Sequence, residues 1–102
     1  MNILLVCGAG ASTSLLVMKM KEAAKKEGKN HTIRAIAQTA LKYEMEVVDV
    51  ILLGPQITFM LEDIRKMVSS RNIPVEVIRS QDYGMCDGEK VLHFAESLMV
   101  KQ

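Results

Sequence analysis

A short, uninterrupted apolar run near the start of the chain constrains the fold more than any other feature. The run Ile3-Leu4-Leu5-Val6 contains no polar residue and is followed by Cys7 and a segment of mostly small residues, 8–14. A strand that is apolar on both faces has to be covered on both faces, which is typical of parallel sheets in α/β proteins. The run therefore predicts a buried strand that ends near Cys7, in a sheet with helices on each side.

The rest of the chain alternates between strand and helix patterns. Further strands are predicted at residues 31–36, 47–53 and 75–78. Helices are predicted from just after Cys7 to Gly28, from about Thr39 to Met45, after Gly54-Pro55, and from Asp87-Gly88 onward, with a loop from Arg79 to Cys86. Helical spacing predicts these residues on the inward faces: Leu16, Met20, Ala23, Ala24, Ile57, Met60, Leu61, Ile64, Met67, Val68, Val91, Leu92, Ala95, Leu98 and Met99.

Short connections between alternating strands and helices force parallel pairing through right-handed crossovers. We therefore predict an α/β fold: an open four-stranded parallel sheet of order 2-1-3-4 with helices on both faces. A chain of 102 residues has room for one core, so we expect a single domain over residues 1–102. Ligands of such sheets bind beyond the carboxyl ends of the strands, where the winding direction reverses, here between strands one and three. Cys7 lies at that place.

Charge and composition exclude several classes of function. Thirteen Lys and Arg against twelve Asp and Glu give a net charge of +1, too small an excess to neutralise many phosphates of a nucleic acid. No run approaches the roughly 18 apolar residues of a membrane span, and the N-terminus lacks the basic residues that open a secretory signal. We expect a cytoplasmic protein without nucleic-acid partners. Two cysteines in a reducing compartment, Cys7 and Cys86, are too few for a disulfide framework or a four-thiolate zinc site, and we expect no metal.

The segment after Cys7 predicts an anion-binding cradle made of Gly8, Ala9, Gly10, Ala11, Ser12, Thr13 and Ser14. Small residues let the backbone curl so that several N–H groups point inward, and the following helix adds the positive end of its dipole. The same field favours the thiolate form of Cys7, which makes this residue a candidate exposed nucleophile. The alternative is that Cys7 is a small buried apolar residue and the glycines only form a turn.

Two other phosphate-binding classes can be tested against this segment. A dinucleotide fingerprint needs a third glycine where this chain has Thr13, and the pattern Gly-Lys-Ser/Thr of nucleotide-binding P-loops is absent. Low-molecular-weight tyrosine phosphatases place a Cys-x5-Arg loop at the end of strand one of a similar fold. Thr13 stands at the arginine position and cannot clamp a phosphoryl group with two parallel hydrogen bonds. Asp82 lies about where such a phosphatase keeps its general acid, so a cysteine-dependent phosphatase is the alternative function.

The chain resembles the IIB components of the lactose/cellobiose type of the bacterial sugar phosphotransferase system, over nearly its whole length. The resemblance rests on the segments CGAGASTSLLV (7–17), LLGPQI (52–57), Met60-Leu61, Pro74-Val75, Tyr83-Gly84, Asp87-Gly88 and Val91-Leu92. It implies that Cys7 accepts a phosphoryl group from a phosphohistidine of the IIA component. It also implies that Cys7 passes the group to a sugar of the cellobiose, lactose or chitobiose class held by the membrane component IIC. The protein would then associate transiently with the membrane through IIC, and no cofactor is implied.

A few further residues are secondary candidates. Gln56, just after Gly54-Pro55, would face the phosphate loop or order the helix that follows it. Tyr83 lies with Met85 in the last strand-to-helix loop, where exposed apolar side chains would meet partner proteins. Arg79 stands where the family often has an aspartate and would favour an acidic docking surface or hold the phosphoryl group. His31 and His93 lie away from the carboxyl ends of the strands and are expected to be structural or solvated.

Overall fold

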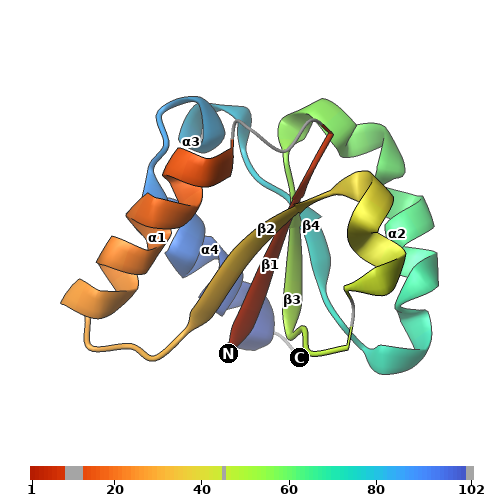
Figure 1. Ribbon diagram of the computed structural model, residues 1–102, viewed down its shortest axis with the longest axis horizontal. Helices are drawn as coiled ribbons and strands as arrows, with labels where there is room; N and C mark the ends of the chain where they lie inside the picture. Colours follow the sequence, from red (N-terminus) through yellow and green to blue (C-terminus); the bar gives the residue numbers. More distant parts are fainter. Residues whose placement is uncertain (9–12, 45, 101–102) are drawn as a thin grey trace.

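The computed structural model describes residues 1–8, 13–44 and 46–100. It contains a parallel four-stranded sheet of order β2-β1-β3-β4 (Figure 1). The strands are β1 (Asn2–Cys7), β2 (Thr32–Ala37), β3 (Val50–Leu53) and β4 (Val75–Val77). The predicted strand order and parallel pairing are therefore confirmed.

Helices cover both faces of the sheet. On one face lie the two long helices, α1 (Ser14–Lys26) and α4 (Gly88–Val100). The other face is covered by the 3-10 helices η2 (Gln38–Tyr43) and η3 (Pro55–Met60) and by α2 (Leu61–Met67). Two short elements complete the chain, the 3-10 helix η4 (Ser69–Arg71) and the helix α3 (Ser80–Gly84). None of the helices within the described residues is long and apolar enough to cross a membrane.

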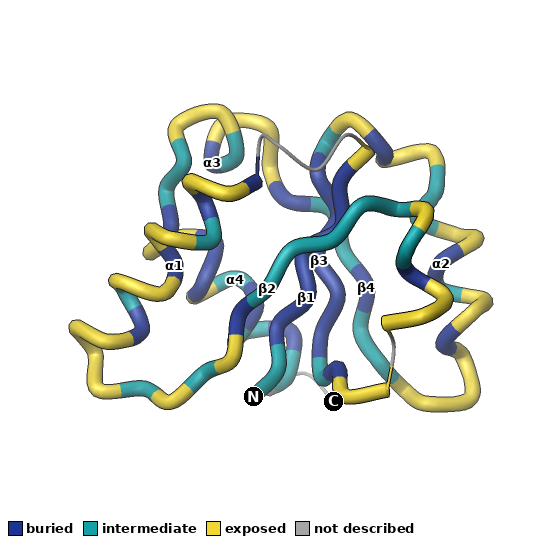
Figure 2. Tube along the Cα trace, viewed as in Figure 1, coloured by how far each residue is buried: buried dark blue, intermediate teal, exposed yellow. Residues whose placement is uncertain are grey.

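Strand β1 is buried on both faces, as its composition predicts. Ile3 and Leu5 belong to the core under α1 and α4, whereas Leu4 and Val6 belong to the core under α2. Figure 2 shows the strands at the centre of the molecule as the buried layer, with exposed residues on the outer sides of the helices. Because side chains alternate along a strand, Cys7 shares the face of Ile3 and Leu5 and so lies on the α1 side.

The ends of the two long helices follow from local sequence. At the end of α1, Gly28 adopts a left-handed φ of 69°. The N–H of Lys29 then reaches back to the carbonyl of Ala24 at 2.8 Å, so one of the last unpaired carbonyls of the helix is satisfied. At the start of α4, the Asp87 carboxylate accepts a hydrogen bond of 3.1 Å from the N–H of Lys90, which is an N-cap interaction.

The strand predicted at 47–53 is shorter than its apolar composition indicates. Val47 is 61% exposed, and β3 begins only at Val50. The register explains the difference, because Val50 pairs with Ile3 near the start of β1, and positions 47 and 48 would run past that end. At this point the Asp49 carboxylate accepts a hydrogen bond from the N–H of Asn2. The last strand likewise ends one residue early, at Val77.

Three helix predictions need correction. The helix expected at about 39–45 is the 3-10 helix η2, because its six residues bury only Leu41 and a short helix with so little packing is marginal; Met45 lies outside the described residues. The helix after Gly54-Pro55 starts as η3, and Met67, predicted inward, is 47% exposed. The expected loop from Arg79 to Cys86 contains α3.

Gly88 generates the first prediction, since the start of α4 lies against the backbone of α1 there. A Cβ atom at Gly88 would lie 2.5 Å from the amide nitrogen of Met20 and closer still to the carbonyl carbon of Lys19. We expect Gly88→Ala to lower the free energy of unfolding by about 2 kcal/mol, because the two helices would have to move apart. Urea denaturation followed by circular dichroism measures this change. Gly84→Ala is the matched control, since nothing lies within 4 Å of its added Cβ.

Candidate functional site

Cys7 is the last residue of β1 and lies between two neighbouring strands at the carboxyl edge of the sheet. It pairs with Ala37 of β2, and β3 lies on the other side of β1. Its Sγ is 3.9 Å from the carbonyl oxygen of Ile36, to which the thiol donates. The residue is 1% exposed, so the expectation of an exposed nucleophile is wrong for this state. The sequence could not predict Ile36 as a neighbour, because the contact is made by its backbone.

Thr13 brings the start of α1 to Cys7. The two residues are six positions apart in the chain, yet Thr13 Oγ1 lies 3.6 Å from Cys7 Sγ, and both are buried. Thr13 occupies the N-cap position of α1 but makes no side-chain capping hydrogen bond. Its hydroxyl is placed to donate to sulfur once the thiol has lost its proton, when the thiol can no longer donate to Ile36.

The other residues of the predicted cradle are only partly described. Ala9, Gly10, Ala11 and Ser12 lie outside the described residues. Gly8 is exposed, and a Cβ there would make an ordinary contact of 3.5 Å with Ile57. Ser14 is exposed and is the first residue of α1, which has no acidic residue in its first turn and has Lys25 and Lys26 in its last. The positive end of this helix is therefore not neutralised by its own side chains.

Gln56 and Tyr83 both lie near Gly54, at the carboxyl end of β3. The N–H of Gly54 donates to the carbonyl of Val6 at 2.9 Å, which ties the turn after β3 to the residue before Cys7. A Cβ at Gly54 would lie 2.7 Å from Gln56 Oε1 and 3.6 Å from Tyr83 Cε1. Both predicted secondary residues therefore lie over this turn, with their side chains covering Gly54.

Asp82 is placed differently from Tyr83, its neighbour in α3. It is buried and lines an open groove together with Arg79 and residues of α4. The described lining of this groove includes neither Cys7 nor Thr13. The general acid that a phosphatase would need is thus not directed at the thiol from this position.

Cys86 is not joined to Cys7 by a disulfide bond. It adopts a left-handed φ of 50° at the turn into α4. There it lines a groove against Lys19 and Lys26 of α1, next to the exposed side chain of Met85. The two cysteines therefore have different surroundings, since Cys7 contacts Thr13 and Ile36 instead.

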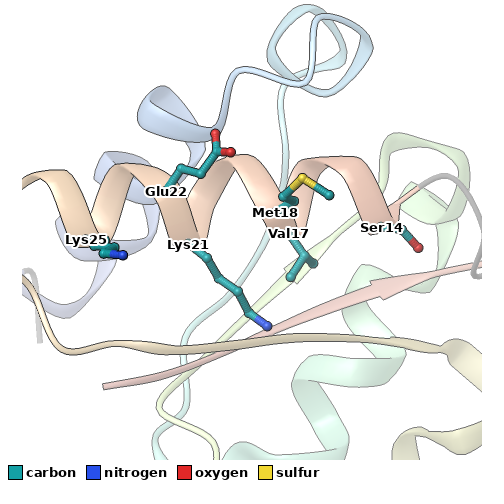
Figure 3. A pocket seen from close by; sticks show the side chains of 6 residues that line it. All are labelled: Ser14, Val17, Met18, Lys21, Glu22 and Lys25. Atoms are coloured by element: carbon teal, nitrogen blue, oxygen red, sulfur yellow. The ribbon is translucent and has the colours of Figure 1, made fainter.

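A groove of about 410 Å³ follows α1 away from the Cys7 loop. Figure 3 shows its six side chains, with Ser14 at the start of the helix and the long side chain of Lys21 further along it. The lining combines exposed Met18 with two lysines and one glutamate. This side of α1 is therefore an apolar strip with a net positive charge, continuous with the candidate site.

Charged residues at the opposite edge of the sheet form a network around Lys29. Its Nζ lies 2.6 Å from Glu27 Oε1 and 2.8 Å from Glu96 Oε1. His31 Nε2 pairs with the other oxygen of Glu96 at 2.8 Å, and His93 Nε2 pairs with Glu27 at 2.9 Å. Ligand atoms of Glu27, His93 and Glu96 lie within 4.8 Å of one another, but the Lys29 ammonium already serves both carboxylates. The network is therefore structural, as predicted for the two histidines.

The Lys29 network shifts the ionisation of its members. Burial raises the pKa of Glu96, but hydrogen bonds from Lys29 and His31 outweigh burial and lower it below its ordinary value of 4.5. Hydrogen bonds from Lys29 and His93 likewise lower the pKa of Glu27. In return, the two glutamates raise the pKa of Lys29 above 10.5.

The fold and the site together define a class of protein: a doubly wound parallel α/β protein with a thiol at its switch point and a helix start beside it. The family model "PTS system, Lactose/Cellobiose specific IIB subunit" matches residues 2–94. The chain belongs to this family, and it is a phosphotransferase component of the sugar phosphotransferase system (PTS) that carries phosphoryl groups.

Curated relatives match the chain over nearly its whole length. The oligo-beta-mannoside-specific EIIB component of Bacillus subtilis is 47% identical over 101 residues, which is 99% of this chain and 98% of the relative. The galactose-specific EIIB component of Lactococcus lactis subsp. cremoris is 44% identical, covering 95% of this chain and 94% of the relative. A solution structure of a cellobiose-specific IIB component from Borrelia burgdorferi matches with a TM-score of 0.81 and 44% identity, covering 99% of this chain and 93% of that one.

A more distant structure confirms the fold alone. The lactose-specific IIB domain from Streptococcus pneumoniae is 20% identical and has a TM-score of 0.86, with 95% of each chain covered. The arrangement of the sheet and its helices is thus kept at a low level of sequence identity.

The lowered pKa of Glu96 predicts a dependence of stability on pH. A folded-state pKa below 4.5 means that ionised Glu96 stabilises the fold above that pH, and that this contribution is lost as the pH falls through the folded pKa. We expect Glu96→Gln to lower the free energy of unfolding by about 1 kcal/mol at pH 7 and to change it less at pH 3. Urea denaturation at both pH values measures the difference. The exposed Glu89, changed to Gln, is the control, and an equal loss in both variants would contradict the prediction.

Proposed function

We propose that Cys7 is the phosphoryl acceptor of this IIB component. It receives the group from a phosphohistidine of the IIA component and passes it to a sugar bound by the membrane component IIC. The observation that carries the proposal is the position of the thiol: the end of β1 at the switch point of the sheet, 3.6 Å from the Thr13 hydroxyl at the start of α1. The residues Gly8 to Ser14 form the cradle for the transferred group.

The two transfers are in-line displacements on phosphorus. In the first, the Cys7 thiolate forms the S–P bond, and the N–P bond breaks with its electron pair left on the donor imidazole. In the second, a sugar hydroxyl oxygen attacks phosphorus, and the S–P bond breaks with its electron pair left on sulfur. The proton released by the hydroxyl then restores the thiol of Cys7. Thr13 donates a hydrogen bond to the negative charge that develops on sulfur, and the positive end of α1 stabilises the phosphoryl oxygens.

Burial of the thiol suits a carrier that reacts only with its partners. Sulfur and phosphorus can meet in line only when the groups over Cys7 move, so we expect donor docking to open the site. Between encounters the cover keeps the free thiol from reacting with other molecules. Hydrolysis is disfavoured for two reasons: Thr13 replaces the arginine clamp of the phosphatases, and Asp82 lines a groove that holds neither Cys7 nor Thr13.

Gln56 and Tyr83 act as positioning residues on this proposal. Their side chains lie over Gly54, whose N–H is bonded to Val6, next to Cys7. By packing on this turn they hold the carboxyl end of β3 against the base of the phosphate cradle. Neither residue has to touch the phosphoryl group to affect its transfer.

The class of sugar and the cellular location are inferred from the roles of the other components of the system. Relatives of nearly equal identity are named for oligo-beta-mannosides, galactose and cellobiose. We infer that the membrane component selects the sugar and that this chain serves a β-linked sugar of the cellobiose, lactose or chitobiose class. The protein works in the cytoplasm as a single domain and meets the membrane through IIC.

Phosphorylation of Cys7 is the prediction that tests the function. Mixing the protein with phosphorylated donor components at neutral pH should add one phosphoryl group to its intact mass, because the thiolate is the acceptor. Cys7→Ser should gain none, since an alcohol is a far weaker nucleophile at this pH.

Two results would contradict the proposal. Phosphoryl transfer to the Cys7→Ser variant would place the acceptor elsewhere. Release of inorganic phosphate without a stable adduct, together with hydrolysis of a small aryl phosphate by the wild type alone, would favour the phosphatase reading.

The exposed apolar side chains near the site predict where the donor docks. Met85 is 72% exposed. It lies in the turn after α3, just after Tyr83. We expect Met85→Ala to raise the donor concentration for half-maximal transfer about fivefold, because an apolar anchor at an interface contributes about 1 kcal/mol, with the maximal rate little changed. Met67→Ala is the matched control: Met67 is also exposed, but it lies at the far end of α2. Equal transfer by both variants would exclude Met85 from the docking surface.

A further inference from the structure

Asp82 is a carboxylate without a hydrogen-bond or ion-pair partner among the residues that the structure describes. It is 8% exposed. Carboxylates in residues buried to this degree are usually hydrogen-bonded or paired. The Asp82 oxygens are not among the fully buried atoms without a partner, so they reach solvent through the groove that the residue lines. The site proposed for phosphoryl transfer does not use Asp82. A ligand in the groove would meet an acceptor that no described protein donor occupies.

The surroundings of Asp82 are positively charged. It lines an open groove of about 320 Å³ with Arg79, Lys90, His93 and Phe94. Arg79 and Lys90 are exposed, and neither forms an ion pair within the described residues. His93 is held through Nε2 by Glu27, which leaves Nδ1 as its other polar atom. The groove thus offers one acceptor, two unused cations and the ring of Phe94.

We propose that this groove binds a small hydroxylated phosphate ester, of the chemical class of sugar phosphates. The phosphate dianion lies between Arg79 and Lys90, where two cations match its two negative charges. A hydroxyl group of the ligand donates to Asp82, and the apolar face of the ring packs against Phe94. The choice of a sugar phosphate among such esters rests on the proposed function, because transfer to a sugar hydroxyl produces one.

Two simpler ligands fit the groove less well. Inorganic phosphate matches the cations but brings no ring to Phe94 and would place its own negative charge against Asp82. An amino acid could place its ammonium on Asp82, but its single carboxylate matches only one of the two cations. The combination of acceptor, cations and ring favours a ligand that carries both a phosphate and hydroxyl groups.

The groove also lies outside the phosphoryl-transfer site, since neither Cys7 nor Thr13 lines it. A ligand there would contact α3, which carries Tyr83, and α4, and the turn between these two helices carries Met85. A sugar phosphate in the groove would therefore be positioned to report the product of transport to the docking surface without blocking the thiol.

The test is a titration of the ¹⁵N-labelled Cys7→Ser variant with glucose 6-phosphate, followed by amide chemical shifts. This background removes the phosphoryl acceptor, so binding in the groove and phosphorylation of wild-type Cys7 can fail independently. We expect saturable shifts at residues 79–94. Lys90→Ala should weaken binding about fivefold and Asp82→Asn about tenfold, because each removes a charge-assisted hydrogen bond. Lys66→Ala removes the same charge from an exposed position of α2 and should leave binding unchanged.

Several outcomes would overturn the proposal. Equal affinity for glucose 6-phosphate in the Lys90→Ala and Lys66→Ala variants would contradict it. Because Lys90 is exposed, this comparison does not depend on whether the Asp82→Asn variant folds. Inorganic phosphate binding as tightly as glucose 6-phosphate would reduce the groove to a simple anion site. Tighter binding of alanine would identify an amino-acid site, and shifts confined to residues outside 79–94 would place the ligand elsewhere.

Discussion

Burial of β1 on both faces is the constraint on which the rest of the structure depends. The strand pairs with β2 on one side and β3 on the other, and its apolar residues are divided between two cores. Each fully buried Leu or Ile contributes about 1.5–3 kcal/mol of hydrophobic stabilisation, so the strand can neither slide nor twist out of register without exposing one core. Cys7 inherits that rigidity as the last residue of the strand. The strand therefore fixes the position of the thiol. On the proposed function, the residues after Cys7 bind the transferred phosphoryl group.

The amino and carboxyl ends of the strands are held by different kinds of interaction. At the amino edge, the terminal amine of Met1 lies 3.1 Å from His31 Nδ1, and the Lys29 network joins the start of β2 to α1 and α4. These interactions join the amino end of the sheet to both long helices. At the carboxyl edge, β1 ends in Cys7 and β3 is followed by Gly54, over which the side chains of Gln56 and Tyr83 lie. The Lys29 network and the candidate site around Cys7 thus lie at opposite ends of the strands.

The sequence predicts the features that depend on local pattern and misses those that depend on distant contacts. The buried strand, a helix after the Cys7 segment and the strand order follow from apolar runs, small residues and connection lengths, although the helix begins only at Ser14. The early start predicted for the third strand was wrong, because Val47 has no neighbour in β1 to pair with. The Lys29 network joins residues more than 60 positions apart, and no local signal marks it. Burial of Cys7 and the different surroundings of Asp82 and Tyr83 are likewise set by packing in three dimensions.

A carrier and a phosphatase built on the same cysteine differ in what they do with the intermediate. Both need a thiolate and a positive cradle, but hydrolysis also needs a clamp and a proton donor directed at the bound group. This chain has Thr13 at the clamp position, and its Asp82 opens onto the groove between α3 and α4. The free thiol is covered, so on the proposed function a partner has to uncover Cys7 before transfer. On the proposed function, specificity depends on which partner protein can uncover Cys7. The surface around Met85 and α1, where we expect the partner to dock, then matters as much as the thiol.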